Sequence, residues 1–320
     1  MDIQFLLMLQ HLREGLGGVF DEFFAFMTNT AVDHWIYVPM LILFWVADKR
    51  KASLVFFSHG FSIFTNGLLK ATFCVYRPWI RSPELKPLDS AMAGATGYSF
   101  PSGHATCSSS FWGGMAMAWR KYKSFVAFCV LVVFLIAFSR LYVGVHTPQD
   151  VLVGLLTGAT MIFLSDKLLK AVDKKPELDA VIMIVATVLS IACYFYVTRK
   201  SYPIDLVDGK PLVDPSKMTV NSFRDFGTAY GMILGWFLER RFVKFSVDGT
   251  AAEKVMRCLW GGLAFVFTQL VIVIPVAKAS KSGLVYFLLF AACMVFFMTV
   301  YPLIFTKIEA KGRAKAAAKK

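Results

Sequence analysis

Long blocks of apolar residues alternate along the chain with short polar and basic stretches. A block of about 20 apolar residues is long enough to cross the hydrocarbon core of a bilayer as a helix. The pattern therefore predicts an all-α fold, a polytopic transmembrane helical bundle with about nine spans. The approximate limits of these spans are 31–47, 52–75, 104–119, 124–142, 149–169, 180–198, 223–239, 256–277 and 283–305.

Residues 1–30 follow a different pattern, in which apolar residues such as Leu6 and Phe24 alternate with polar ones such as Gln10 and Asp21. This alternation predicts an amphipathic helix that lies in the membrane interface, rather than a tenth span. The chain then divides into three parts: the interfacial helix (1–30), a membrane core that carries the polar motifs (31–175), and additional transmembrane helices with a basic tail (176–320).

The composition supports a membrane protein. Hydrophobic residues make up 57% of the chain and charged residues 17%, and the mean hydropathy is +0.59. The net charge of +13 could indicate a nucleic-acid partner, but the basic residues lie between apolar blocks and form no stripe with interleaved aromatics. We therefore expect no nucleic acid among its partners. The six cysteines stand singly, most of them in apolar blocks, which indicates neither a zinc site nor disulfides.

The distribution of basic residues predicts the orientation. If every span crosses, 21 of the 34 Lys and Arg residues share one side with the C-terminal tail. Such loops are usually cytoplasmic, so residues 76–103, 143–148 and 199–222 should face outward. We expect an integral protein of the plasma (inner) membrane with a cytoplasmic tail. The start Met1-Asp2 lacks a basic region, so no cleavable signal peptide is expected.

Three polar segments lie at outward ends of predicted spans. In the first, Lys70 precedes Arg77-Pro78 by seven residues, a spacing that places both cations on one face of a helix. Two such cations at a membrane boundary suit a phosphate group, because Arg supplies a planar fork and Lys a point charge. Snorkelling of both side chains toward lipid headgroups is the alternative.

The second segment is Pro101-Ser102-Gly103-His104, directly before a predicted span. Ser102 is a good helix N-cap, and Gly103 allows a ligand to approach the backbone closely. The first turn of a helix binds anions through free N–H groups, and His104 projects from that turn with a pKa near neutrality. An ordinary capped helix start with an exposed histidine would give the same pattern.

The third segment runs from Ser139-Arg140 to His146-Thr147-Pro148-Gln149-Asp150. Thr147 is expected to cap a helix that begins at Pro148, which brings the Asp150 carboxylate close to His146. A carboxylate on one ring nitrogen fixes the tautomer and leaves the other nitrogen free to attack. A structural His–Asp pair is the alternative, and Arg140 adds a third cation.

Together the segments indicate phosphoryl transfer, which depends mostly on positioning and charge stabilisation. The basic groups would hold the phosphate, His146 would form a phosphohistidine, and His104 would protonate the leaving oxygen and then activate water. Asp150 would orient His146. The expected phosphate-binding residues are Lys70, Arg77, Ser102, Gly103 and Arg140.

These segments resemble the three-part signature of the type 2 phosphatidic acid phosphatase superfamily, KxxxxxxRP, PSGH and SRxxxxxHxxxD, and match every fixed position over residues 70–150. The resemblance implies the same residue roles, no metal or other cofactor, and a membrane lipid phosphatase. The same family includes soluble vanadium haloperoxidases. The resemblance thins after residue 170, although longer relatives also carry extra spans.

The expected activity is hydrolysis of a lipid phosphate or lipid pyrophosphate monoester, since an outward site at the membrane boundary favours amphiphiles. Transfer of the phosphate to a lipid or sugar hydroxyl is an alternative, as are soluble esters such as sugar phosphates. A transporter or lipid-binding protein with a degenerate core is a third interpretation, which the intact motifs disfavour.

Outside the motifs, Gly227, Gly231 and Gly235 repeat every four residues. Small residues at this spacing permit close helix packing in membranes, and a substrate-gating or homodimer contact stays open. Glu239 is expected to form an interfacial ion pair beside Arg240 and Arg241. The remaining histidines, which have no motif around them, are expected to be structural or interfacial: His11, His34 and His59.

Overall fold

The computed structural model describes residues 2–29, 36–92, 94–95, 97–207 and 210–318. Within these ranges the chain is almost entirely helical, as the apolar blocks predict. The helices are α1 (Asp2–Gly15), α2 (Asp21–Asn29), α3 (Tyr37–Val46), α4 (Lys49–Phe73), α5 (Pro78–Arg81), α6 (Asp89–Met92), α7 (Gly103–Ala118), α8 (Lys123–Tyr142), α9 (Pro148–Lys174), α10 (Leu178–Arg199), α11 (Pro215–Leu238), α12 (Ala251–Thr268), α13 (Ile274–Ala279), α14 (Gly283–Val295) and α15 (Tyr301–Ala317). Two-residue strands, β1 (Leu206–Val207) and β2 (Lys210–Pro211), pair antiparallel.

Six helical runs in the described part of the chain are long and apolar enough to cross a membrane. They are Lys49–Arg81, Lys123–Tyr142, Pro148–Lys174, Leu178–Arg199, Ala251–Ala279 and Gly283–Ala317. The other three expected spans coincide with α3, α7 and α11. α3 has 10 residues and α7 has 16, whereas α11 carries Lys217, Arg224 and Asp225. The membrane bundle is thus confirmed, and the number of nine spans stays a prediction.

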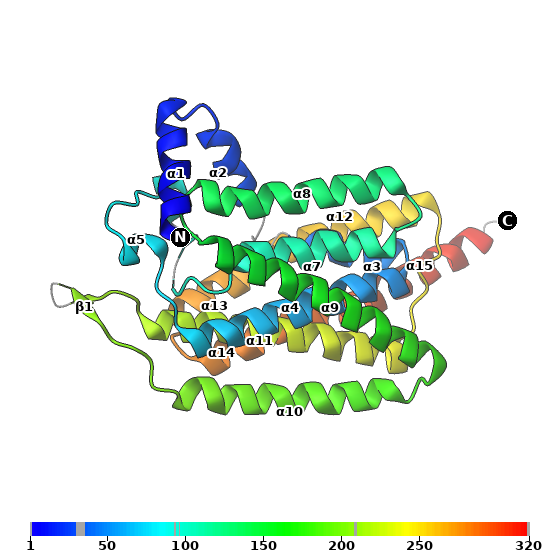
Figure 1. The fold of residues 1–320 in the computed structure, drawn as a ribbon. Coiled ribbons are helices and arrows are strands. Elements are labelled where there is room, and N and C mark those ends of the chain that lie inside the picture. The colour runs from blue at the N-terminus through cyan, green and yellow to red at the C-terminus, as the bar shows by residue number, and fades with distance from the viewer. Residues whose placement is uncertain (1, 30–35, 93, 96, 208–209, 319–320) are drawn as a thin grey trace.

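The long helices run side by side, with α4 packed against α7, α9 and α11 (Figure 1). The end of α4, the start of α7 and the start of α9 meet at one end of the bundle, beside α5 and the N-terminal helices. The end of α15 lies at the opposite end of the molecule (Figure 1).

The N-terminal segment is two helices rather than the single helix expected. Gly17 and Gly18 have positive φ angles of 63° and 71°, a conformation that glycine adopts without steric cost, and they turn the chain between α1 and α2. Arg13 donates to the carbonyl of Lys86 at 3.0 Å. The resulting hairpin is therefore fixed to the loop that follows α5.

Gly227 and Gly231 of α11 pack against α14, and Gly235 packs against Met298, just after α14. A Cβ atom added to Gly231 would lie 2.7 Å from the Cα atom of Ala291, and one added to Gly227 would overlap the backbone of Phe287. The expected role in close helix packing is confirmed within the chain. On another face, α11 packs on α4, where a Cβ on Gly67 would lie 3.2 Å from the ring of Phe226.

Glu239 begins a π-helical turn (Glu239–Val243) directly after α11 and forms an ion pair with Lys49 at 2.7 Å. The predicted ion pair exists, but the neighbouring arginines are not its partners. Arg241 pairs instead with Asp179 at 2.5 Å, which joins this turn to the start of α10.

Candidate active site

The segment with Lys70 and Arg77 departs from the expected continuous helix. α4 ends at Phe73, and Cys74 follows in the left-handed conformation with φ 51°. Arg77 is extended (φ −64°, ψ 151°), because the ring of Pro78 disfavours helical geometry in the residue before it. The expectation that one helix face presents both cations is therefore wrong, although both side chains line one cavity.

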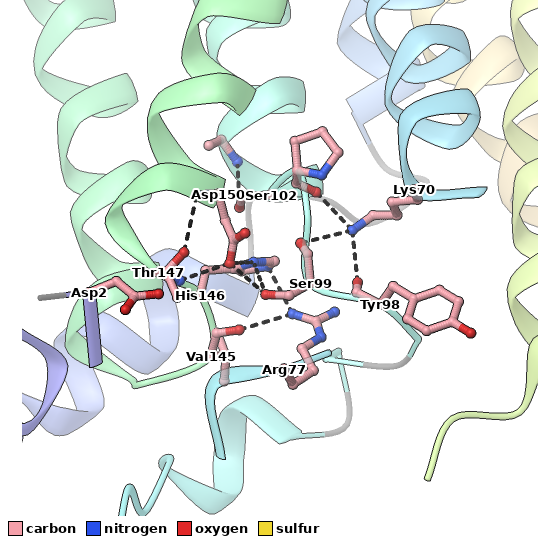
Figure 2. A network of polar contacts seen from close by, with 12 residues as sticks. Asp2, Lys70, Arg77, Tyr98, Ser99, Ser102, Val145, His146, Thr147 and Asp150 are labelled. Atoms are coloured by element: carbon pink, nitrogen blue, oxygen red, sulfur yellow. Dashed lines mark hydrogen bonds and ion pairs between the residues drawn. The ribbon is translucent and has the colours of Figure 1, made fainter. Parts of the chain in front are cut away.

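Lys70 ties the end of α4 to the segment before α7. Its Nζ atom lies 3.1, 3.3 and 2.8 Å from the carbonyl oxygens of Tyr98, Ser99 and Pro101 (Figure 2). An ammonium group has three donors, so each has a carbonyl within reach. The charge of Lys70 therefore lies at the cavity wall while its hydrogen bonds position the loop.

The second segment begins α7 as predicted. The Ser102 hydroxyl accepts from the Ala105 N–H at 3.4 Å, and the Ser102 N–H donates to the carbonyl of Asp150 at 2.9 Å. The Ser102 carbonyl accepts from the Thr106 N–H at 3.0 Å, and Ser102 is not among the residues that line the cavity, so its phosphate contact stays a prediction. Gly103 and His104 follow in the first turn and line the cavity, where N–H groups have no intrahelical acceptor and the helix end is partially positive.

The third segment forms the predicted capping box, in which Thr147 caps α9 and exchanges hydrogen bonds with Asp150. His146, just before it, is 1% exposed. Its Nε2 atom lies 2.9 Å from Nη1 of Arg77. Because a guanidinium group can only donate, Nε2 must be the unprotonated nitrogen, and the proton of the neutral ring lies on Nδ1.

Ser99 joins His146 to Asp150, a role that the motifs did not reveal. The Ser99 hydroxyl donates to Oδ2 of Asp150 at 2.5 Å and lies 3.3 Å from Nδ1 of His146. The direct distance from Nδ1 to Oδ2 is 3.4 Å. The same carboxylate oxygen accepts from the N–H of Thr147 at 2.8 Å, so the carboxylate is held firmly (Figure 2). The sequence gave one indication that Ser99 lies at the site, which is its position three residues before Ser102 of the second motif.

Arg140, at the end of α8, is 1% exposed. Its Nη1 atom donates to the hydroxyl of Thr28 in α2, another contact that the sequence did not predict. Its Nε and Nη2 atoms have no hydrogen-bond partner among the described residues. Buried unpaired donors are unfavourable, so an oxygen acceptor bound to this guanidinium would be stabilising.

The pKa of His146 is well below its ordinary value of 6.5. Burial is the main cause, and the positive charges of Arg77, Arg140 and Lys70 lower it further. The imidazole is therefore neutral at physiological pH. A neutral ring has the lone pair that a nucleophile needs.

The cavity at this site has a volume of about 150 Å³. Motif residues form one side of it, and Asn221, Ser222, Arg224 and Asp225 of α11 form part of the rest. The sequence contained a signal for the last two, since ionisable residues in an apolar helix suggest function.

The histidines outside the motifs agree with a structural role where the chain is described. His59 is buried beside the same cavity, with Nδ1 3.1 Å from the hydroxyl of Ser110. His11 is exposed on α1. His34 lies outside the described residues.

Comparison with known proteins gives two family matches. Residues 51–172 match the PAP2 superfamily, and residues 223–313 match the transmembrane extension of PAP2 superfamily phosphatases. The chain belongs to the PAP2 superfamily. The first match includes all three motifs of this PAP2 protein. The second extends the relationship well beyond residue 170, where the motif resemblance thinned, and includes most of α11.

Two curated relatives align with parts of this PAP2 protein. An undecaprenyl-diphosphatase of Sulfolobus acidocaldarius is 31% identical over 136 residues, which are 41% of this chain and 61% of that protein. A lipid A 1-phosphatase of Rhizobium johnstonii is 39% identical over 67 residues, 21% of this chain and 26% of that protein. The alignments thus span less than two thirds of either relative. No solved structure matches the chain.

Proposed function

We propose that this PAP2 protein is a membrane phosphatase that hydrolyses a lipid phosphate or lipid pyrophosphate through a phosphohistidine on His146. The contact between Arg77 and Nε2 of His146 is the main support for the proposal. Because the guanidinium group donates to Nε2, the lone pair of the ring lies on this nitrogen, and His146 lines the cavity. His146, His104 and Asp150 are the proposed catalytic residues. Lys70, Arg77, Gly103 and Arg140 are the proposed phosphate-binding residues, with Ser102 placing Gly103 at the helix start.

In the first step, Nε2 of His146 attacks phosphorus and the bond from phosphorus to the leaving oxygen breaks. His104 gives its proton to that oxygen, and the Nδ1 proton of the His146 imidazolium faces Ser99 and Asp150. In the second step, water attacks phosphorus, His104 takes a proton from it, and the phosphorus–nitrogen bond breaks. Inorganic phosphate leaves, and His146 regains its lone pair.

The cations supply the charge stabilisation that this reaction needs. Arg77 can exchange its contact with Nε2 for a phosphate oxygen as the nucleophile attacks, and Arg140 has two buried donors without partners among the described residues. Preorganised donors in a site shielded from water are usually the largest single contribution to such catalysis. No metal enters this scheme, so chelators should leave the rate unchanged.

A lipid substrate and an outward site are supported by three observations. Both relatives are named as phosphatases of phosphorylated lipids. The helices around the cavity include runs that can cross a membrane. The described end of α15, which leads into the basic tail, lies at the end of the bundle opposite the motifs (Figure 1). A cytoplasmic tail would thus place the cavity near the extracytoplasmic surface.

The test is a phosphate-release screen with the purified full chain in detergent. Phosphate release by the unaltered protein and by His146→Ala would be compared for four kinds of substrate: prenyl diphosphates, phosphatidic acid, a glycerol-headed lipid phosphate and a sugar phosphate. We expect release from at least one lipid, loss of release in the variant, and no effect of a chelator. Equal release by both proteins would contradict the proposal. Phosphate appearing on an added alcohol instead of in solution would identify a phosphotransferase.

A further inference from the structure

We infer that the ion pair Arg224–Asp225 of α11 recognises the hydroxylated, uncharged head of a phosphate monoester and disfavours a diphosphate. The glycerol or sugar part of a lipid headgroup is the chemical class it fits. The inference rests on the proposed function, since it names what that site accepts beyond the phosphate being removed.

The pair belongs to the cavity that contains the motif residues. Arg224 and Asp225 line it together with Arg77, His104 and His146. Their side chains are partly exposed, 34% for Arg224 and 23% for Asp225. A substrate whose phosphate lies at His146 would therefore extend along this wall.

α11 reaches the cavity because glycines on α4 allow close approach. A Cβ on Gly67 would lie 3.7 Å from Cα of Ser222, and one on Gly60 would lie 3.6 Å from Cα of Ala229. Lys70 lies one turn beyond Gly67 on α4. The same packing that joins the two helices therefore places α11 beside the first motif.

The pair offers a donor and an acceptor side by side. Nε and Nη2 of Arg224 both lie 2.9 Å from Oδ1 of Asp225. Among the described contacts, Oδ2 of Asp225 and Nη1 of Arg224 have no hydrogen bond. A hydroxyl group can donate to the first and accept from the second. Asn221, one turn earlier, lines the same cavity and adds an amide donor and acceptor.

The charge of the pair decides between the two kinds of substrate. The pair has no net charge, whereas the motif side holds Lys70 and Arg77. The carboxylate of Asp225, 2.9 Å from the guanidinium of Arg224, offsets the attraction that this cation alone would have for a second phosphate beyond the scissile bond, and its own charge repels that phosphate. Specificity commonly uses such a repulsive element as well as attractive contacts.

An ion pair that is largely removed from solvent is unfavourable, so a purely structural role would need a compensating contact. The ion pair of Glu239 with Lys49 is an example of a structural role, because it joins segments that are far apart in the sequence. Arg224 and Asp225 are adjacent on one helix and join nothing by their mutual contact. Their placement at a cavity wall is therefore better explained by a ligand.

The test measures the ratio of kcat/KM for a glycerol-headed lipid phosphate to that for a prenyl diphosphate. Asp225→Asn leaves the charge of Arg224 unopposed, so this ratio should fall about tenfold or more, the effect of one hydrogen bond to a charged group. The double variant Arg224→Gln/Asp225→Asn removes both charges and should also lower the ratio. Lys217→Gln, on an exposed position of the same helix, should leave it unchanged.

The outcomes separate this inference from the proposed function. If the unaltered protein releases phosphate but neither variant changes the ratio, the role of the pair is wrong and the phosphatase proposal stands. A wild-type preference for the diphosphate would also overturn the role of the pair. If the unaltered protein releases phosphate from no substrate, the proposed function itself fails. The melting temperature of each variant shows whether the fold is intact, and the double variant decides if Asp225→Asn is unstable.

Discussion

Nη1 of Arg77 lies 2.9 Å from Nε2 of His146, on the side of the ring opposite the Asp150 carboxylate. One cation therefore has two effects: it fixes the tautomer, and it disfavours the protonated ring. In the proposed mechanism, an arriving phosphate takes the guanidinium away from Nε2 and thereby frees this nitrogen to attack.

The acidic side of the pH profile should reflect His146. Burial and the charges of Arg77, Arg140 and Lys70 lower the pKa of His146. The ring therefore stays neutral at pH 6.5, where an ordinary histidine is half protonated, and takes up its second proton only in more acidic solution. The value of kcat/KM should therefore persist into mildly acidic solution and fall when the free enzyme takes up a proton. The measurement is the pH dependence of kcat/KM for one substrate.

Arg77→Gln is the matched comparison, because it removes one of the charges that lower the pKa of His146. The pH at which kcat/KM of this variant falls on the acidic side should move upward toward 6.5, even if its overall rate is low. The same substrate is used for both proteins, so ionisation of the substrate cancels. An acidic limb above 6.5 in the unaltered protein would contradict the assignment.

Ser99→Ala tests the connection between His146 and Asp150. The hydroxyl bonded to Oδ2 of Asp150 is lost, and Nδ1 is left with the carboxylate at 3.4 Å. We expect kcat to fall about 10- to 100-fold, the effect of losing a hydrogen bond to a charged group. KM should change little, because Ser99 acts through the histidine.

Ser108→Ala is the control for that experiment. Ser108 is also buried near the start of α7, but among the described residues its hydroxyl bonds only to the carbonyl of Ala105, at 3.2 Å. Its kcat should stay near the unaltered value. A similar loss in both variants would mean that Ser99 matters for stability rather than for orienting His146.

Arg140 should couple oxyanion binding to stability. Its two buried donors without described partners gain acceptors when an oxyanion such as vanadate binds. A ligand at about 100 times its Kd stabilises the folded state by about 2.7 kcal/mol. Vanadate should therefore raise the melting temperature of the unaltered protein in detergent by several degrees. An equal rise in Arg140→Leu would show that the anion binds elsewhere.

The sequence was most informative where local chemistry decides the structure. Thr147, Pro148 and Asp150 form the predicted capping box, and Ser102 caps α7, because such caps depend on residues within one turn. The helical prediction failed between Lys70 and Arg77, where Cys74 ends α4 in a left-handed conformation. That ending leaves Arg77 free to reach His146.

The contacts missed by sequence come from distant segments. Thr28 reaches Arg140 across 112 positions, and Ser99 reaches Asp150 across 51. Arg224 and Asp225 join the cavity only because α11 packs on α4 through Gly60 and Gly67. No periodicity within one helix contains that information, since it depends on which helix faces which.

The glycines of α11 provide a test of that packing. A Cβ on Gly231 would lie 2.6 Å from the carbonyl oxygen and 2.7 Å from Cα of Ala291, so Gly231→Ala must push α14 away. Overpacking of this kind costs about 1–3 kcal/mol, which should lower the melting temperature in detergent. Gly262→Ala is the matched control, because nothing lies within 4 Å of its added Cβ and alanine favours a helix. Its melting temperature should be equal or higher, and equal losses in both variants would contradict the α11–α14 contact.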